Sequence, residues 1–284
     1  FLSANAGIWM DTSESLVQIL HRSPGSFSNL SIRLTANTVS ATTTFTLRKN
    51  AAAGNLTVSV GASATGAFSD STNSDAIAAG DKTALQSVPG AGSTGTFTMY
   101  SASLTFAAAT DTVTRSTITD QTSITTASTT FFAMMSGFVA NAGLTTVEAN
   151  AKVRIRKAGT FKNVCLNVTT NARTATTYRS RKNGANGNCT FSITASTTGF
   201  FEDTTNSDSV AVGDDYCHSL VTGTGTSSMV IQTWAIDFVS TAGYTLTTIS
   251  GRAGSAITDG ITAGFAIAGE ASGRSTRDPP GSSR

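Results

Sequence analysis

The sequence predicts an all-β protein made of two tandem antiparallel β-sandwich domains, jelly-roll-like and derived from an internal duplication. Three observations lead to this prediction. Thr and Ser supply 86 of the 284 residues (50 Thr and 36 Ser), and these side chains suit half-solvated strands and turns better than long helices. Short stretches of alternating apolar and polar residues recur along the chain. One long segment also occurs twice.

The two copies are related by a nearly constant offset of 133 or 134 residues. The matched segments are 25–34 with 159–168, 48–50 with 181–183, 68–75 with 201–208, and 80–81 with 213–214. Because the offset holds across separate motifs, shared composition alone does not explain the match. We therefore predict a first sandwich at 1–108, a connecting segment at 109–128, a second sandwich at 129–240 and a C-terminal extension at 241–284.

Strand patterns follow one another in the same way in both copies. Apolar residues alternate with polar ones over 30–34, 45–47 and 56–60 in the first copy, and over 164–168 and 189–193 in the second. A late strand is predicted in each copy, at 97–106 and at 229–238. Clusters of Gly, Asn, Asp and Ser separate these stretches at the short spacings of a sandwich or barrel. No apolar stripe of helical period persists, so we expect no substantial helix.

Composition and motifs argue against several classes of function. The formal net charge is +2, which provides no strong field for nucleic acid, and no run of about 18 apolar residues predicts membrane insertion. The two histidines, His21 and His218, do not occupy matching positions of the repeat. The sequence contains no nucleophile motif, no zinc-binding histidine pair and no phosphate-binding glycine loop. We therefore expect no enzymatic activity and no cofactor.

Acidic residues recur at matching positions of the two copies. Asp70 and Asp75 in the first copy return as Asp203 and Asp208 in the second, each pair beside a repeated Asn. Clustered carboxylate and amide oxygens suit a hard cation such as calcium, although the spacing lacks the calcium-loop signature. Asp and Asn also cap turns by accepting hydrogen bonds from nearby backbone N–H groups. The turn role is the interpretation that we prefer, with calcium as the alternative.

Cysteines and glycosylation motifs give weaker signals. The three cysteines lie in the second copy, and neither a disulfide framework nor a zinc-ligand spacing is present. Cys189 and Cys217 are the candidates for a disulfide bridge, which would leave Cys165 free. Four Asn-x-Ser/Thr motifs occur, and Asn55 and Asn188 are the glycosylation candidates because they occupy equivalent positions of the repeat.

The opening strand of the repeat returns near the C-terminus. Segment 257–269 resembles segment 124–136 at the same offset of 133 residues. An unpaired strand with an apolar face is a liability unless something pairs with it. We expect this segment to pack on another copy of the chain and so produce head-to-tail assembly, and the alternative is that it folds back onto its own domain. The apolar residues that would carry this contact are Ile257, Ile261, Phe265 and Ile267.

A family resemblance accompanies these motifs. The run at 25–34, the turn at 45–50 and the later Phe-x-Asp and Gly-Asp motifs resemble a repeat of tailed-phage structural proteins. They are similar, more loosely, to the jelly rolls of tumour-necrosis-factor-like proteins and of spore-surface glycoproteins. The resemblance covers 25–106 and 159–239, and the second copy departs from the pattern at 178–182. It implies a surface or appendage module and no particular chemistry.

These observations predict a structural virion protein, such as a fibre, decoration or tail component, that forms homo-oligomers at an extracellular or virion surface. Other virion proteins or surface glycans are further expected partners. The first alternative is the subunit of a bacterial or archaeal extracellular filament. A secreted carbohydrate-binding β-sandwich is a weaker alternative, because it needs an aromatic platform and the chain has only two Trp and four Tyr.

Overall fold

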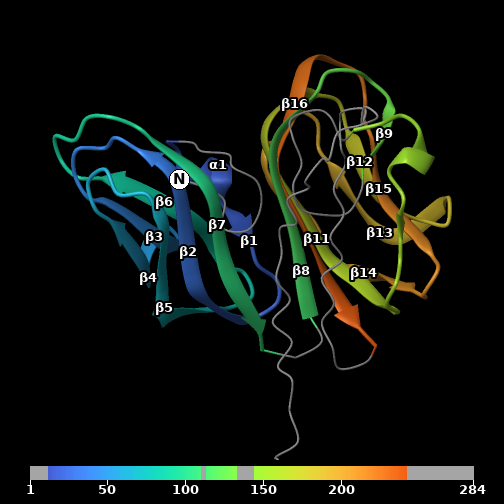
Figure 1. Cartoon of the computed structure of the whole chain (residues 1–284). Coiled ribbons are helices and arrows are strands. Elements are labelled where there is room, and N and C mark those ends of the chain that lie inside the picture. Colours follow the sequence, from blue (N-terminus) through green and yellow to red (C-terminus); the bar gives the residue numbers. More distant parts are fainter. Residues whose placement is uncertain (1–11, 110–112, 133–143, 242–284) are drawn as a thin grey trace, which may run out of the picture.

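The computed structural model describes residues 12–109, 113–132 and 144–241, and these form two β-sandwich units (Figure 1). The predicted all-β class is confirmed, since the described helices are only α1 (Glu14–Val17) and the 3-10 turn η1 (Glu148–Asn150). Within the described part of the chain, no helix is long and apolar enough to cross a membrane. We call residues 12–109 unit 1, and we call residues 113–132 with 144–241 unit 2.

Unit 1 consists of two antiparallel sheets that face each other. The first has the order β1-β6-β3-β4 and the second the order β5-β2-β7. The bounds of these strands are β1 Ile19–Leu20, β2 Gly25–Asn37, β3 Thr43–Lys49, β4 Ala52–Val60, β5 Gly66–Ile77, β6 Lys82–Pro89 and β7 Phe97–Ala108. Alternation places one side of every strand between the sheets, where Phe27, Leu30, Phe45 and Leu56 are fully buried.

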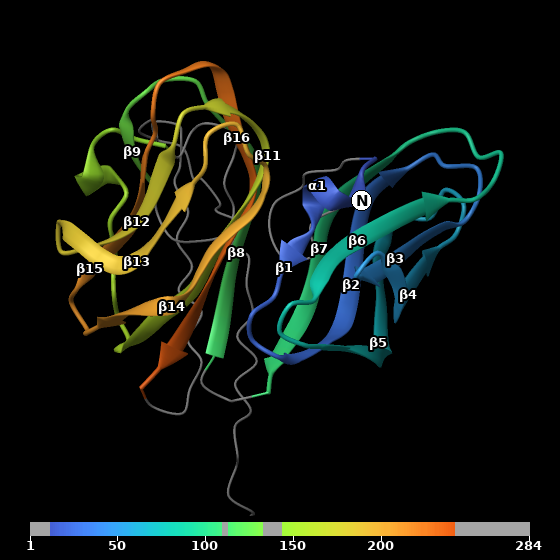
Figure 2. The same ribbon diagram turned by 180° about the vertical axis from the view of Figure 1, so that it is seen from behind.

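Unit 2 repeats this arrangement and adds two strands. One sheet has the order β10-β15-β12-β13, with β9 also paired to β15, and the other has the order β14-β11-β16-β8. The bounds are β8 Val113–Ile124, β9 Thr129–Phe132, β10 Val153–Arg154, β11 Gly159–Arg173, β12 Thr176–Lys182, β13 Ala185–Ile193, β14 Gly199–Val210, β15 Asp215–Val221 and β16 Gly225–Ser240. Figure 2 shows both units from behind.

The strand orders of the two units correspond element by element. The order β5-β2-β7 matches β14-β11-β16, and β1-β6-β3-β4 matches β10-β15-β12-β13. Details of the pairing recur as well: Phe27 lies opposite Asp75 and Phe161 opposite Asp208. A bulge also interrupts β2 at Asn29 and β11 at Asn163, both with positive φ.

The segment 109–128, predicted as a connection, is mostly a strand. It contains β8, which pairs with β16 along almost its whole length and forms the edge of the second sheet of unit 2. The short strand β9 then pairs with β15 in the other sheet. The predicted connecting segment therefore supplies one edge strand, β8, to unit 2, and β9 comes from the first residues of the predicted second sandwich.

Unit 1 packs on the outer face of the β11–β16 sheet of unit 2 through α1, β1 and the turn that follows. Leu20, Cys165 and Ala235 form a small buried apolar cluster. The hydroxyl of Ser23 donates a hydrogen bond of 2.7 Å to the buried carboxylate of Asp237. Arg22 pairs with Glu202 at the edge of this contact.

Candidate functional site

The carboxylate of Asp70 is the centre of a turn in β5. Both of its oxygens accept hydrogen bonds, from the backbone N–H groups of Thr57, Thr72 and Asn73 and from the side chains of Thr72 and Asn73, at 2.9–3.1 Å. These donors, the N–H of Thr57 first among them, hold the pKa of Asp70 well below its usual range. The network ties β5 to β4.

Asp203 has the same surroundings in unit 2. It accepts bonds from the N–H groups of Thr190, Thr205 and Asn206 and from the side chains of Thr205 and Asn206. Burial alone would raise its pKa, but these donors outweigh burial and the pKa is lowered. The carboxylates at both positions are thus saturated by donors from the protein itself.

Asp75 and Asp208 form a second pair of caps, which bind backbone N–H groups within β4 and β13. Asp75 accepts hydrogen bonds from the N–H groups of Asn55 and Leu56, at 2.7 and 3.0 Å. Asp208 accepts from the N–H of Asn188 and from the buried hydroxyl of Tyr216, at 2.5 and 2.9 Å. Both carboxylates are almost completely buried.

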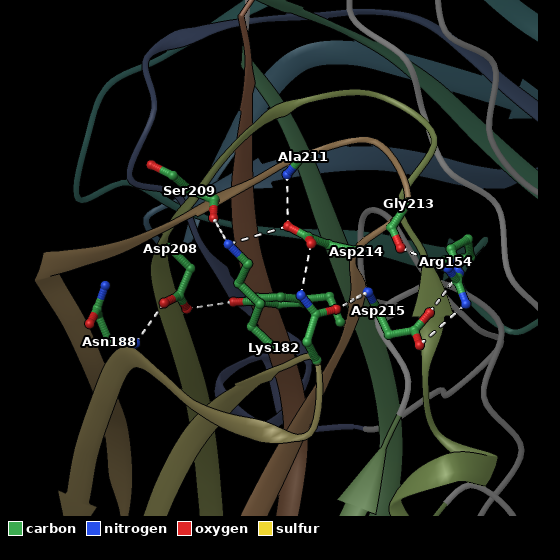
Figure 3. Close-up of polar contacts among 11 residues, drawn as sticks. Arg154, Lys182, Asn188, Asp208, Ser209, Ala211, Gly213, Asp214 and Asp215 are labelled. Carbon is green, nitrogen blue, oxygen red and sulfur yellow. Dashed lines mark hydrogen bonds and ion pairs between the residues drawn. The ribbon is translucent and has the colours of Figure 1, made fainter.

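A third cap closes the turn before β15 (Figure 3). Asp214 accepts hydrogen bonds from the N–H of Ala211 and the side chain of Asn183, both at 2.8 Å, and pairs with Lys182 at 3.2 Å. These contacts, the Ala211 N–H first, lower the pKa of Asp214 to about 2. Lys182 also donates to the carbonyl of Ser209 at 2.8 Å. In unit 1, Asp81 makes the corresponding bonds to Ala78 and Asn50.

The repeated acidic residues therefore cap turns. Their oxygens face N–H groups, which a cation would have to displace. No group of three or more His, Cys, Asp or Glu side chains that could hold a metal ion occurs among the described residues. The geometry accordingly favours the turn interpretation of Asp70, Asp75, Asp203 and Asp208 over calcium binding.

The glycosylation candidates belong to the same caps. The amide of Asn55 donates to the carbonyl of Ser74 at 3.2 Å, and the amide of Asn188 donates to the carbonyl of Ser207 at 2.9 Å. Both side chains lie at the surface. Their equivalent placement in the repeat thus has a structural reason, which is to join neighbouring strands next to a buried Asp.

Both histidines lie in the interior. His21 makes a hydrogen bond of 2.7 Å through Nε2 to the hydroxyl of Thr83. His218 makes one of 2.5 Å through Nδ1 to the hydroxyl of Tyr178, and its ring packs against Phe132 and Trp234. Burial lowers the pKa of His218 to about 3, so the ring is neutral near pH 7.

The three cysteines are free thiols, and the candidate bridge between Cys189 and Cys217 is not formed. Cys189 lies on β13 and Cys217 on β15, and β12 runs between these strands, which places the two residues on strands that are not adjacent. Burial raises the pKa of Cys217 to about 12 and that of Cys189 further still. Both thiols are therefore protonated and poorly reactive.

The outer edge of β7 distinguishes unit 1 from unit 2. In unit 2, β16 lies between β11 and β8, whereas in unit 1 β7 pairs with β2 alone among the described strands. The inward-facing side chains differ accordingly. Phe97 and Leu104 of β7 are only half-buried, whereas Met229 and Ile236, which occupy the same positions of β16, are fully buried. The described strands thus leave the core of unit 1 incompletely covered along this edge.

A second edge of unit 1 differs in the same way. In unit 2, β9 covers residues 218–221 of β15. The corresponding part of β6, residues 85–88, pairs only with β3 within the described chain, because β1 reaches only Lys82 and Thr83. Ser219 and Leu220 are buried under β9, while their counterparts Gln86 and Ser87 are half-exposed.

Sequence reasoning did not find these two edges, because they depend on which strands become neighbours. The predicted assembly residues Ile257, Ile261, Phe265 and Ile267 lie outside the described residues. A comparison with protein-family models gives no match, and a comparison with curated proteins gives none either.

Proposed function

We propose that this chain is a non-enzymatic structural protein that assembles with copies of itself as a virion component, such as a fibre, decoration or tail protein. The observation that carries the proposal is the outer edge of β7, with which no other described strand pairs and behind which Phe97 and Leu104 are half-buried. Open sheet edges with an apolar face are sites of strand addition. The resemblance to tailed-phage structural repeats supports the virion setting.

The polar side chains support a structural role. The repeated aspartates cap turns, His218 bonds to Tyr178 inside the core, and the thiols of Cys189 and Cys217 are buried and protonated. In the described structure, the repeated aspartates and His218 therefore join strands, and the two thiols are buried in the interior.

An extracellular filament subunit is the second candidate, and the same edge favours it. A contact between one surface and a different surface of the next copy produces a ring if the rotation closes and a filament if it does not. Carbohydrate binding receives no such support from the aromatic side chains that the structure describes, because Trp234, Tyr178 and Tyr216 are buried.

Electron microscopy of the native particle, combined with sedimentation of the purified chain, tests this proposal. We expect the purified chain to sediment as regular oligomers or polymers, and the native material to contain the chain in capsid-bearing particles with DNA. Bare filaments without capsids would favour the second candidate. A chain that stays monomeric at high concentration and is dispersed in the native material would contradict self-assembly altogether.

A further inference from the structure

We propose that the buried guanidinium of Arg173 is the centre of an anion-binding site at one end of unit 2, and that its ligand is a small oxyanion with a carboxylate or a phosphate group. This site goes beyond the proposed assembly, which does not require it. The proposal is carried by the donor atoms of Arg173, by the composition of the turns around it and by a comparison with the equivalent end of unit 1.

Arg173 is the last residue of β11 and is only 3% exposed. Its Nη1 atom donates a hydrogen bond of 3.3 Å to the carbonyl of Gly225, while Nε and Nη2 are buried and have no hydrogen-bond partner in the described part of the chain. A guanidinium keeps its positive charge in proteins. A buried charge is strongly disfavoured unless a group of opposite charge compensates it, and no described side chain forms an ion pair with Arg173.

The two unpartnered atoms of Arg173 are the pair that recognises oxyanions. Nε–H and the neighbouring N–H of Nη2 point in the same direction and match the two oxygens of a carboxylate or a phosphate group. Arg22 uses this same pair to bind both carboxylate oxygens of Glu202, with Nε at 2.7 Å from Oε2. The geometry that Arg173 presents is thus one that this chain already uses to bind a carboxylate.

The turns around Arg173 contain hydroxyl groups and no carboxylate. The connections 174–175, 194–198 and 222–224 meet at this end of unit 2 and consist only of Thr, Ser, Ala and Gly. Backbone hydrogen bonds join them, since the N–H of Ser196 donates to the carbonyl of Arg173 at 3.2 Å and the N–H of Thr174 donates to the carbonyl of Thr224 at 2.7 Å. A group of opposite charge therefore has to come from outside these turns.

Unit 1 shows that the fold does not need a charge at this position. The N–H of Val39 donates to the side chain of Asn37 at 3.0 Å, as the N–H of Arg173 donates to the side chain of Asn171 at 3.0 Å. Val39 thus occupies the position of Arg173, and it is equally buried, at 2% exposure. Because an apolar side chain fills this place in unit 1, the guanidinium in unit 2 points to a role other than packing.

A bulge accompanies Arg173 in unit 2. The pairing of β11 with β16 shifts between Asn171 and Arg173, so that the Thr-Ser-Ser run at 226–228 bulges out directly after Gly225. The described pairing of β2 with β7 has no shift at the corresponding Asn37. The charged side chain and a bulge that carries hydroxyl groups therefore occur together in one copy of the repeat, as expected for a site that this copy acquired after the duplication.

The position of the guanidinium limits the size of the ligand. Thr174, Ala175 and Gly225 are exposed, whereas Arg173 directly beneath them is buried. The hydroxyl of Thr222, which is also buried and has no partner among the described residues, is a further donor in the same group of turns. A small oxyanion needs only a local movement of these turns to reach Arg173, whereas a large ligand would have to separate the strands.

Thermal unfolding of the full chain tests the site. The probes are sodium phosphate, sodium sulfate and sodium acetate, each compared with sodium chloride at the same ionic strength. We expect phosphate or acetate to raise the unfolding midpoint of unit 2 in the wild-type chain by at least about 3 °C. Arg173→Val, which copies Val39, should show no such increase. In chloride, this variant should unfold at a higher temperature than the wild type, because an apolar side chain replaces an uncompensated buried charge.

Two further variants separate the paired donors from charge alone. Arg173→Lys keeps a positive charge but lacks the planar pair of N–H groups, so it should retain less than half of the increase in midpoint. It also provides the comparison with the wild type if Arg173→Val does not fold. Arg156→Val is the matched control, because Arg156 is an exposed arginine of unit 2, and it should keep the whole increase.

The response to each salt identifies the chemistry of the ligand. An increase with acetate alone assigns a carboxylate, and an increase with phosphate and sulfate assigns a phosphate-like group. Equal midpoints of the wild-type chain in all four salts would overturn the proposal. An equal increase in the wild type and in Arg173→Val would also overturn it, since the salt would then act through an adventitious ion only. Sedimentation of the same samples reports on self-assembly separately, so a failure of this site leaves the proposed function standing.

Discussion

The two units bury equivalent core positions with different chemistry. Tyr178 and His218 form a buried hydrogen-bonded pair in unit 2, and the corresponding residues of unit 1 are Phe45 and Leu85, which are fully apolar and equally buried. Burying a polar pair is tolerated only if both partners stay satisfied. Unit 1 therefore supplies a natural apolar replacement for this pair.

This pair leads to a prediction about stability. Tyr178→Phe should reduce the free energy of unfolding of unit 2 by about 1–3 kcal/mol, because it leaves the ring nitrogen of His218 buried without its partner. The double variant Tyr178→Phe/His218→Leu, which copies unit 1, should regain most of this loss. Urea denaturation of the wild-type chain, the two single variants and the double variant measures the coupling.

If the two substitutions lower the free energy of unfolding by the sum of their single effects, this account is wrong. The pH dependence of the free energy of unfolding provides a second check. The pKa of His218 is lowered by burial to about 3 in the folded chain, compared with about 6.5 in an unfolded chain. Its contribution to stability is complete above about pH 6.5 and is lost as the pH falls toward 3, at up to about 1.4 kcal/mol per pH unit. Variants that lack His218 should lose this slope.

At the scale of single elements, the strands are joined by caps that require glycine. A Cβ atom at Gly54 on β4 would lie 2.5 Å from Oδ2 of Asp75 and 2.8 Å from the carbonyl oxygen of Leu47. At the equivalent Gly187, it would lie 2.3 Å from the hydroxyl of Ser180. The repeated Gly-Asn dipeptide thus allows β4 and β13 to approach their capping aspartates.

Gly54→Ala should therefore reduce the free energy of unfolding of unit 1 by about 1–3 kcal/mol, because the cap must shift to admit the methyl group. Gly61→Ala is the matched control, since a Cβ atom at Gly61 meets nothing within 4 Å, and we expect a change within about 0.5 kcal/mol. Thermal or urea unfolding checks both. Equal losses in the two variants would refute the role of this close approach.

The sequence predicted most of the strands that units 1 and 2 have in common, because apolar alternation is strong in segments such as 30–34 and 164–168. It also predicted the Asp caps, which are local. It missed β8, whose apolar residues Val113, Ile118 and Ile124 are too widely spaced to give a period of two. Pairing of β8 with β16 is a long-range choice that no local pattern specifies.

At the scale of the whole molecule, the repeat becomes asymmetric where the units meet. The outward positions that carry Cys165 and Ala235 in unit 2 carry Ser31 and Ser103 in unit 1. This difference between the copies is the signal from which the contact could have been predicted. It is hard to recognise beforehand, because the sequence does not tell which outward face of unit 2 meets unit 1.

Leu20→Asp should separate the unfolding of the two units. It places a charge in the buried cluster with Cys165 and Ala235, where an unpaired carboxylate is strongly disfavoured. We expect calorimetry to show two transitions farther apart than in the wild-type chain, with unit 2 still folded. Val212→Asp is the control, because Val212 is 63% exposed. An unchanged thermogram for Leu20→Asp would show that this cluster does not couple the units.

The pairing of β8 with β16 also has a consequence for synthesis on the ribosome. β8 ends at residue 124 and β16 begins at residue 225, so the partner of β8 is made about 100 residues later. At roughly 5–20 residues per second, β8 waits on the order of 5–20 s for that partner. Its sequence is rich in Thr and Ser and contains Arg115 and Asp120, a composition that discourages misplaced pairing of a nascent strand. The polar side chains that leave β8 without a recognisable apolar alternation thus also discourage misplaced pairing in the growing chain.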